Sequence, residues 1–184
     1  MDSLPAQLTK LYTRAVIKRR PPDREALVTH LRRTMNGSPL PLALPRGVSR
    51  SQRELGGRPC HVVTTARPRE TVLYIHGGGF IAGRPDTYHA LAGRLAAGRD
   101  ARVFLPTYRL APEHPFPAGH EDTLMVYRAL LAEGTDPDHL TVAGDSAGGG
   151  LTLSLLLAAR DAGLPLPRCA VLISPFADLT LGGP

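Results

Sequence analysis

At residues 140–149 the chain reads Leu140-Thr141-Val142-Ala143-Gly144-Asp145-Ser146-Ala147-Gly148-Gly149. The first half of this stretch is short and apolar, as expected of a buried strand. Residues 147–160 are apolar on nearly every side, which predicts a buried helix. The pattern G-x-S-x-G stands at the junction, where a sharp turn raises a serine hydroxyl above the end of a sheet. The stretch therefore predicts a layered α/β fold with Ser146 as a candidate nucleophile.

The small residues around Ser146 have a physical role in such a turn. A strand that turns directly into a helix holds the serine in a strained backbone conformation, and β-carbons at the flanking positions would collide. The hydroxyl then lies at the N-terminus of the helix, where free N–H groups favour a developing oxyanion. The alternative is purely structural, because a serine at this position is also a good helix N-cap.

Strand-like and helix-like segments alternate on both sides of this stretch. Strands are expected at residues 48–55, 58–65, 71–75, 101–105, 140–144 and 169–174, and helices at 87–97, 118–133 and 147–160. Gly56-Gly57 is a hairpin signal between the first two strands, and Leu91 and Leu95 should point inward from the first helix. The alternation indicates a mostly parallel sheet with helices on both faces, in the strand order 1-2-4-3-5-6.

A run of glycines follows the strand at residues 71–75. In His76-Gly77-Gly78-Gly79-Phe80 the backbone can approach a ligand closely and turn its N–H groups inward. A phosphate loop would need the spacing G-x-x-x-x-G-K-[ST], which this run lacks, whereas a plain flexible turn is the simpler alternative. We expect His76 to anchor the loop through hydrogen bonds and not to act as a general base.

A proline-rich segment, Tyr108-Arg109-Leu110-Ala111-Pro112-Glu113-His114-Pro115-Phe116-Pro117-Ala118, follows the strand at residues 101–105. Prolines restrict the backbone, and an arginine and a glutamate within the segment could brace it by an ion pair. We therefore expect a rigid support beneath the site, braced by Arg109 and Glu113, with no catalytic role for His114.

The N-terminal part of the chain differs in composition from the rest. The formal net charge is +6, and residues 1–36 hold eight basic and three acidic side chains. Two amphipathic helices are expected at residues 6–19 and 23–35, the second with Leu27, Leu31 and Met35 on one face. We divide the chain into a helical cap segment, residues 1–45, and a core domain, residues 46–184. A basic module that binds nucleic acid or a membrane surface is the least favoured interpretation, because no nucleic-acid motif accompanies the charge.

Composition also bounds the cellular setting. The 184 residues include two cysteines, Cys60 and Cys169, which suits a reduced cytoplasmic protein better than a disulfide scaffold. No apolar run of ~18 residues is present, so no membrane-spanning helix is predicted.

Three motifs in one order, HGGGF, YRLAPEHPFPA and GDSAGG, resemble the hormone-sensitive-lipase-like (bacterial family IV) branch of the α/β-hydrolases. The resemblance covers residues 1–184, including ISPFADLT at 173–180, and implies a partial α/β-hydrolase fold with an N-terminal cap. It also implies hydrolysis of small carboxylic esters without a cofactor or metal. By resemblance Ser146 is the nucleophile, the oxyanion-hole donors are Gly78, Gly79 and Ala147, and the supporting motif residues are His76, Gly77 and Asp145.

The chain departs from this family in its catalytic acid and base. The family's triad follows the order serine, acid, histidine. The seven histidines all precede Ser146, and Asp161 and Asp178 do not match the family's acid. We therefore expect a truncated, nearly inactive form, because a serine needs an adjacent base, and a last strand bared as a sheet edge that could self-associate. The alternative is a non-catalytic ligand-binding or partner protein on the same scaffold.

Overall fold

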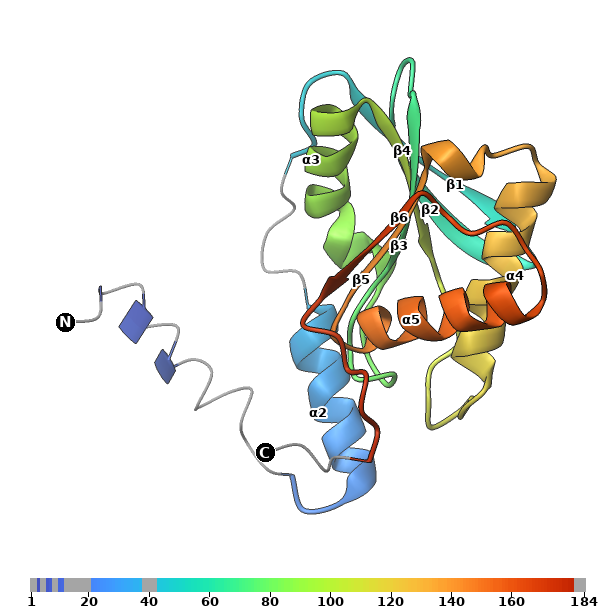
Figure 1. The fold of residues 1–184 in the computed structure, drawn as a ribbon. Helices are drawn as coiled ribbons and strands as arrows, with labels where there is room; N and C mark the ends of the chain where they lie inside the picture. Colours follow the sequence, from blue (N-terminus) through green and yellow to red (C-terminus); the bar gives the residue numbers. More distant parts are fainter. Residues whose placement is uncertain (1–2, 4–5, 8–9, 12–20, 38–42, 181–184) are drawn as a thin grey trace.

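The computed structural model describes residues 3, 6–7, 10–11, 21–37 and 43–180, and these residues build one six-stranded sheet with helices on both faces (Figure 1). The strands are β1 (Val48–Leu55), β2 (Arg58–Thr65), β3 (Glu70–Ile75), β4 (Ala101–Pro106), β5 (Leu140–Asp145) and β6 (Cys169–Ile173). The helices are α2 (Arg24–Asn36), α3 (His89–Arg99), α4 (Ala118–Ala132) and α5 (Ser146–Asp161). Short 3₁₀ turns precede α3 and β5, at Pro85–Tyr88 and Pro137–His139.

The strand order is β1-β2-β4-β3-β5-β6, as predicted. β1 and β2 form the antiparallel hairpin around Gly56-Gly57, and β2 pairs antiparallel with β4. The pairs β4–β3, β3–β5 and β5–β6 are parallel. The parallel strands therefore direct their carboxyl ends to one edge, where the loops after β3 and β4 and the start of α5 meet (Figure 1).

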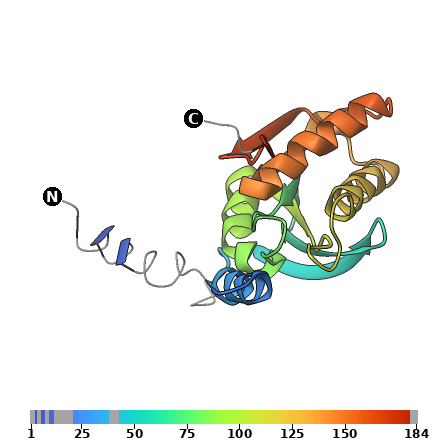
Figure 2. The same cartoon turned by 90° about the horizontal axis from the view of Figure 1, so that it is seen from below.

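The sheet buries both of its faces because neighbouring residues of its central strands point to opposite sides. Val72 and Tyr74 pack in the layer that contains α3, whereas Leu73 and Ile75 pack in the layer that contains α4 and α5. Figure 2 shows α3 on one side of the sheet and α4 and α5 on the other. Central strands buried on both faces explain their nearly continuous apolar sequences.

Helix α3 packs differently from the prediction. It begins at His89, after the 3₁₀ turn, and its buried residues are Ala92, Gly93 and Ala96. Leu91 is an exposed large hydrophobic residue, so its predicted inward position is wrong, while Leu95 packs partly against the core. Small residues face the sheet here, which lets the helix backbone approach closely.

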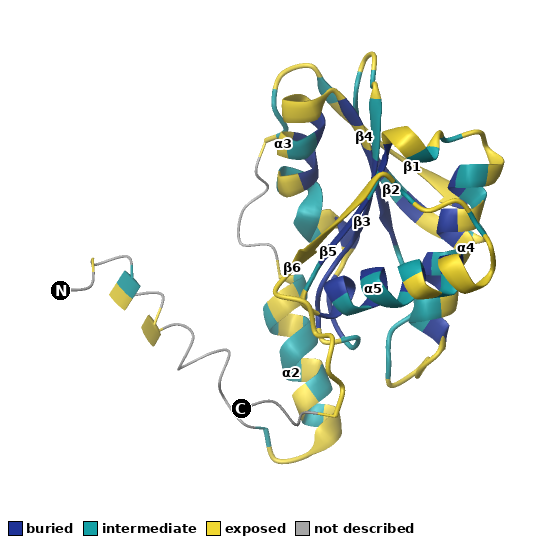
Figure 3. Ribbon diagram, in the orientation of Figure 1, coloured by how far each residue is buried: buried dark blue, intermediate teal, exposed yellow. Residues whose placement is uncertain are grey.

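Two elements remain largely exposed (Figure 3). All five residues of β6 are exposed. Helix α2 has no buried residue, and Leu27 and Met35 of its predicted apolar stripe are exposed. The helix predicted at residues 6–19 falls mostly outside the described residues. Leu31, the third residue of the α2 stripe, is half-buried. Hydrogen bonds from Arg32 and Asn36 also attach α2 to the loops of the candidate site.

Candidate active site

Ser146 stands at the sharp turn from β5 into α5. It is the first residue of α5, and its φ of 51° lies in the left-handed region that a residue with a β-carbon seldom adopts. Ser146 is exposed, and its backbone carbonyl accepts a 2.8 Å hydrogen bond from the Phe176 N–H. The strained serine expected from the sequence is therefore present at the carboxyl edge of the sheet.

Glycines on both sides of Ser146 make this turn possible. A β-carbon at Gly148 would collide with the carbonyl oxygens of Ile75 and His76, and one at Gly144 would collide with the carbonyl of Gly148. The first turn of α5 thus packs directly on the end of β3. The same close approach brings the loop after β3 beside Ser146.

The loop after β3 folds back on itself at its glycines. Gly78, Gly79 and Phe80 have φ values of 134°, 62° and 63°, and the Ala82 N–H donates to the Gly78 carbonyl at 2.9 Å. Within the described residues the N–H groups of Gly78 and Gly79 have no acceptor. The Ala147 N–H lies in the first turn of α5, where backbone N–H groups have no acceptor inside the helix. Unused N–H groups from both segments are thus available at one edge of the sheet.

The Asp145 carboxylate ties this loop to the serine turn. Its Oδ1 accepts hydrogen bonds from the Gly77 N–H and the Tyr74 hydroxyl, both at 3.1 Å, and its Oδ2 accepts one from the Tyr88 hydroxyl at 3.0 Å. Burial, together with the nearby Asp145 charge, raises the pKa of Tyr74 and raises the pKa of Tyr88 to about 12, so both remain donors. Asp145 is therefore a fixed brace between the two segments. The roles of Tyr74 and Tyr88 had no signal in the sequence.

His76 anchors the same loop from beneath, as expected. It is 1% exposed, its Nδ1 lies 2.8 Å from the Gly77 carbonyl, and its own carbonyl accepts the Tyr108 hydroxyl at 2.8 Å. The two rings stack with centroids 4.4 Å apart. Burial lowers the pKa of His76, which keeps the imidazole neutral.

The proline-rich loop is braced, but not in the predicted way. Arg109 binds Asp122 and, more weakly, Glu121, both on α4, whereas Glu113 binds Arg32 on α2. The predicted Arg109–Glu113 pair is therefore wrong. Arg109 and Glu113 both point out of the loop. Arg109 pairs with the buried carboxylate of Asp122 on α4, and Glu113 pairs with the guanidinium of Arg32 on α2, because these partners bind more strongly than a neighbour in the same turn.

Arg32 joins α2 to both loops of the site. Its guanidinium forms a fork on Glu113 at 2.7 and 2.6 Å and also donates to the carbonyls of Ile81 at 2.8 Å and Ala111 at 3.0 Å. One turn later on the same face, Asn36 accepts the Gly83 N–H at 2.8 Å. Helix α2 thus holds the loop after β3 by polar contacts.

None of the seven histidines hydrogen-bonds Ser146 within the part of the chain that the structure describes. His61 and His89 bond each other, His120 bonds Ser154 of α5, and His139 lies by Glu70. His114 lies in the exposed proline-rich loop and His30 on α2. Among the described residues, the Ser146 hydroxyl therefore has no hydrogen-bonded histidine that could act as its base.

An apolar cavity of about 350 Å³ opens beside the glycine loop. Its walls come from that loop, the proline-rich loop, α4 and α5, and include Gly79, Phe80, Ile81, Phe116 and Leu151. Of the three expected oxyanion-hole donors, Gly79 lines this cavity.

The described residues contain no group of three or more histidine, cysteine or acidic side chains that could hold a metal ion. No helix among them combines the length and apolar character needed to cross a bilayer.

Comparison with known proteins places these features in a family. A family model of the α/β-hydrolase fold matches residues 72–183. An acetyl-hydrolase of Streptomyces hygroscopicus is 49% identical over 113 residues, which cover 61% of this chain and 38% of that protein. Carboxylesterase NlhH of Mycobacterium tuberculosis is 44% identical over 116 residues, covering 60% of this chain and 36% of that protein.

Solved structures agree with the sequence matches. An esterase of the bacterial hormone-sensitive lipase family superposes with a TM-score of 0.82 at 32% identity, covering all of this chain and 61% of its own. Esterase EstE5, soaked with p-nitrophenyl butyrate, superposes with a TM-score of 0.81 at 37% identity, with coverages of 96% and 60%. The chain thus spans less than two thirds of the proteins that it matches.

Proposed function

The chain belongs to the α/β-hydrolase fold family, and from this premise we propose that it carries the nucleophile and oxyanion hole of a carboxylic ester hydrolase. The observation that carries the proposal is Ser146, exposed in a left-handed conformation between a parallel strand and a helix, beside a loop with unused N–H groups. The resemblance to hormone-sensitive-lipase-like esterases supports the same assignment.

Each residue of the proposed site has a distinct task. The Ser146 oxygen attacks the ester carbonyl carbon, the bond to the alcohol oxygen breaks, and the serine proton leaves with the alcohol. The N–H groups of Gly78, Gly79 and Ala147 stabilise the negative oxygen of the tetrahedral intermediate. Gly77, His76 and Asp145 hold the loop and the serine turn in register through the hydrogen bonds described above.

The base for this reaction has no candidate among the seven histidines. Asp145 is not the acid of a triad either, because its carboxylate is occupied by Tyr74, Tyr88 and the Gly77 N–H. Removing triad members from a serine hydrolase leaves a residual ~10³–10⁴-fold acceleration over water. Residues 1–184 are therefore expected to bind esters and to turn them over very slowly.

The apolar cavity beside Gly79 gives the ester an orientation. With its carbonyl oxygen at the proposed N–H donors, the acyl chain enters a recess of about 350 Å³ lined by Phe80, Ile81 and Leu151. Burial of each methylene group of the acyl chain in this recess contributes about 0.8 kcal/mol to the binding free energy, so longer acyl groups are favoured over acetyl.

Hydrolysis of p-nitrophenyl butyrate tests the proposal in two arms. Residues 1–184 should give a slow rate that Ser146→Ala leaves nearly unchanged. The same residues joined to the remaining segment of the Streptomyces hygroscopicus acetyl-hydrolase should hydrolyse the ester rapidly and lose at least 10³-fold of the rate on Ser146→Ala. A joined protein that folds and is fast without Ser146 would refute the assignment.

A second function, ligand binding without turnover, is favoured by one observation: Ser146 has no histidine partner among the described residues. It predicts saturable binding of a slowly hydrolysed ester to residues 1–184. The joined protein distinguishes the two, since a scaffold that had lost catalysis would stay slow even with an acid and a histidine restored.

Three further proposals concern the domain boundary, the cellular compartment and self-association. We place the boundary between the cap segment and the core at residue 45, next to Leu44, which packs partly on the core. Both cysteines are free, which suits a reducing compartment such as the cytoplasm. The open edge of β6 is a site for association with a second copy of the chain.

A further inference from the structure

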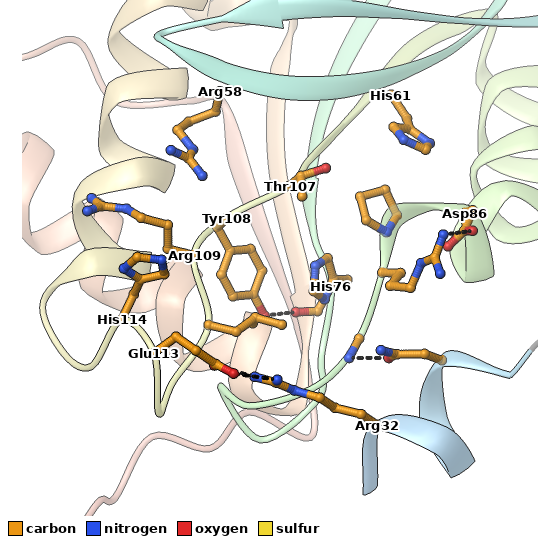
Figure 4. Close-up of a pocket in the computed structure, with 15 residues that line it drawn as sticks. Arg32, Arg58, His61, His76, Asp86, Thr107, Tyr108, Arg109, Glu113 and His114 are labelled. Carbon is orange, nitrogen blue, oxygen red and sulfur yellow. Dashed lines mark hydrogen bonds and ion pairs between the residues drawn. The ribbon is translucent and has the colours of Figure 1, made fainter. Parts of the chain in front are cut away.

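A second cavity, of about 640 Å³, adjoins the apolar cavity and shares Tyr108, Arg109 and His114 with it (Figure 4). Its walls come from α2, β2, the segment between β3 and α3, and the loop after β4. Neither Ser146 nor Gly78, Gly79 or Ala147 lines it. The proposed nucleophile and oxyanion-hole donors therefore lie outside this cavity.

Two guanidinium groups in this cavity share one buried carboxylate. Arg109 contacts both carboxylate oxygens of Asp122. Its backbone N–H donates to Oδ2 at 2.7 Å, its side-chain Nη2 donates to Oδ1 at 2.8 Å, and its Nε lies 3.0 Å from both oxygens. Asp122 is 0% exposed. Arg58 approaches the same Oδ2 with its Nε at 3.3 Å, without the geometry of a hydrogen bond.

The Arg58 side chain is left without acceptors. Its Nε is buried and has no hydrogen-bond partner, and no described residue accepts from its two terminal nitrogens. The side chain is 25% exposed, and Figure 4 shows it extending into the cavity. A buried donor without a partner costs about 1–3 kcal/mol, more when it is charged, unless a water or an ion satisfies it.

The other charges of the cavity are already balanced. Arg32 forms its fork on Glu113, and Arg84 pairs with Asp86 at 2.8 Å. Arg109 also contacts Glu121 at 3.3 Å. Arg58 is thus the guanidinium of this cavity whose nitrogens have no hydrogen-bonded acceptor among the described residues.

We propose that this cavity binds the carboxylate of a small organic acid, with Arg58 as its anchor. A guanidinium offers two parallel N–H donors that match the two oxygens of a carboxylate, and a carboxylate supplies the acceptors that the Arg58 nitrogens lack. The Thr107 hydroxyl lies in the same cavity as a further donor, and Leu110 and Pro85 offer apolar contact to the carbon part of the acid.

Titration with sodium acetate and sodium propionate at constant ionic strength tests the proposal. The ¹H–¹⁵N signal of the Arg58 Nε–H is followed on residues 1–184. Both acids should shift it saturably, whereas acetamide, a neutral molecule of the same shape, should bind at least tenfold more weakly. Equal binding of acetamide would overturn the proposal, and so would phosphate binding as tightly as acetate, because the ligand would then not be a carboxylate.

Matched arginine variants locate the site. Arg58→Met should weaken acetate binding about tenfold or more, followed at the Thr107 and Leu110 amides, and Arg58→Lys should weaken it less. Arg84→Met removes another guanidinium of the same cavity, one that already has a partner, and should leave binding within twofold. Equal losses in the Arg58 and Arg84 variants, or an unsaturable shift in the unaltered chain, would overturn the proposal. If Arg58→Met does not fold, Arg58→Lys and the acetamide comparison still decide.

Discussion

At Ser146 the chain stores backbone strain where the proposed chemistry takes place. Its surroundings keep Ser146 in the left-handed conformation. Gly144 and Gly148 lack β-carbons, so neighbouring backbone carbonyls can approach them closely, and the Ser146 carbonyl accepts a hydrogen bond from the Phe176 N–H. Strain of this kind costs of order 1–3 kcal/mol and persists only when the surrounding structure enforces it. The close approach of Gly148 to the end of β3 is therefore the most sensitive contact of the site.

Gly148→Ala should destabilise the fold. The added β-carbon would meet the backbone carbonyl oxygens of Ile75, the last residue of β3, and of His76, which follows it and is buried. We expect the free energy of unfolding to fall by about 3 kcal/mol, measured by urea denaturation. Gly98→Ala is the matched control: it lies in α3 with no atom near the added carbon, and should be neutral or stabilise by up to about 1 kcal/mol. Equal effects of the two changes would contradict this account.

At the scale of elements, α2 acts through polar contacts. Leu27 and Met35 are exposed, whereas Arg32 and Asn36 lie one turn apart and reach three different carbonyl or N–H groups of the two site loops. The helix therefore restrains the loop from which Gly78 and Gly79 are expected to donate.

Arg32→Met should loosen this loop. The free energy of unfolding should fall by about 1–2 kcal/mol, since three acceptors lose a charged donor at a partly exposed site. Amide hydrogen exchange should quicken at Gly83 and at Ala82 beside it. Arg33→Met, which removes an exposed arginine from the same turn of α2, should change neither. Unchanged exchange at Gly83 in the Arg32 variant would show that α2 does not hold the loop.

A second link between elements is a chain of hydrogen bonds through two histidines. The His61 Nδ1 lies 2.8 Å from the His89 Nε2, the His61 Nε2 lies by the Gln52 amide, and Arg50 faces the His89 Nδ1 at 3.4 Å. The Gln52 Nε2 donates to His61 Nε2, and the His61 Nδ1 then donates to His89 Nε2. The chain then requires both rings to be neutral.

Stability should accordingly fall in mild acid. Burial is the main cause that lowers the pKa of His61 and of His89, helped by Arg50 and opposed by Asp86, and burial also lowers the pKa of His76. The unfolded chain takes up these protons near pH 6.5, so this contribution is complete above that pH and is lost as the pH falls below it. Urea denaturation between pH 7.5 and 5 should show the loss, and His89→Gln should reduce it. His114→Gln, in an exposed loop, should not, and a pH-independent free energy would refute the account.

At the scale of the whole molecule, the sheet has one open apolar edge. β6 pairs with β5 alone among the described strands, and Val171, Leu172 and Ile173 are 46%, 38% and 48% exposed. Edge strands with unpaired backbone groups tend to pair with another chain.

We expect residues 1–184 to self-associate through β6. Sedimentation should show a mass that rises with protein concentration, and Leu172→Lys should shift the equilibrium toward the monomer, because charge blunts an edge strand. Leu91→Lys, another exposed leucine but on α3, is the control and should not shift it. A monomer at all concentrations would exclude this association.

The individual strands and the serine turn could be predicted because each depends on local pattern, and the strand order followed from the strand–helix alternation and the right-handed crossover rule. Apolar runs, Gly56-Gly57 and the motif around Ser146 each specify their own conformation. The Arg32–Glu113 fork could not, since it joins side chains 81 residues apart and no local pattern marks one arginine among many. The predicted inward position of Leu91 was wrong for a related reason. The face that α3 turns to the sheet is formed by small residues, Ala92, Gly93 and Ala96, and their fit against the sheet is a tertiary contact that a local apolar pattern does not reveal.

The most direct test of the central claim is to place a tetrahedral anion on Ser146. The boron of butaneboronic acid accepts the serine oxygen, an O–B bond forms, and the serine proton passes to solvent, so no histidine is needed. NMR of residues 1–184 should show a tetrahedral ¹¹B signal and saturable shifts at the amides of Gly78, Gly79 and Ala147 together, all lost in Ser146→Ala. A tetrahedral adduct that leaves those three amides unmoved, or shifts that persist in Ser146→Ala, would contradict the assignment of nucleophile and oxyanion hole.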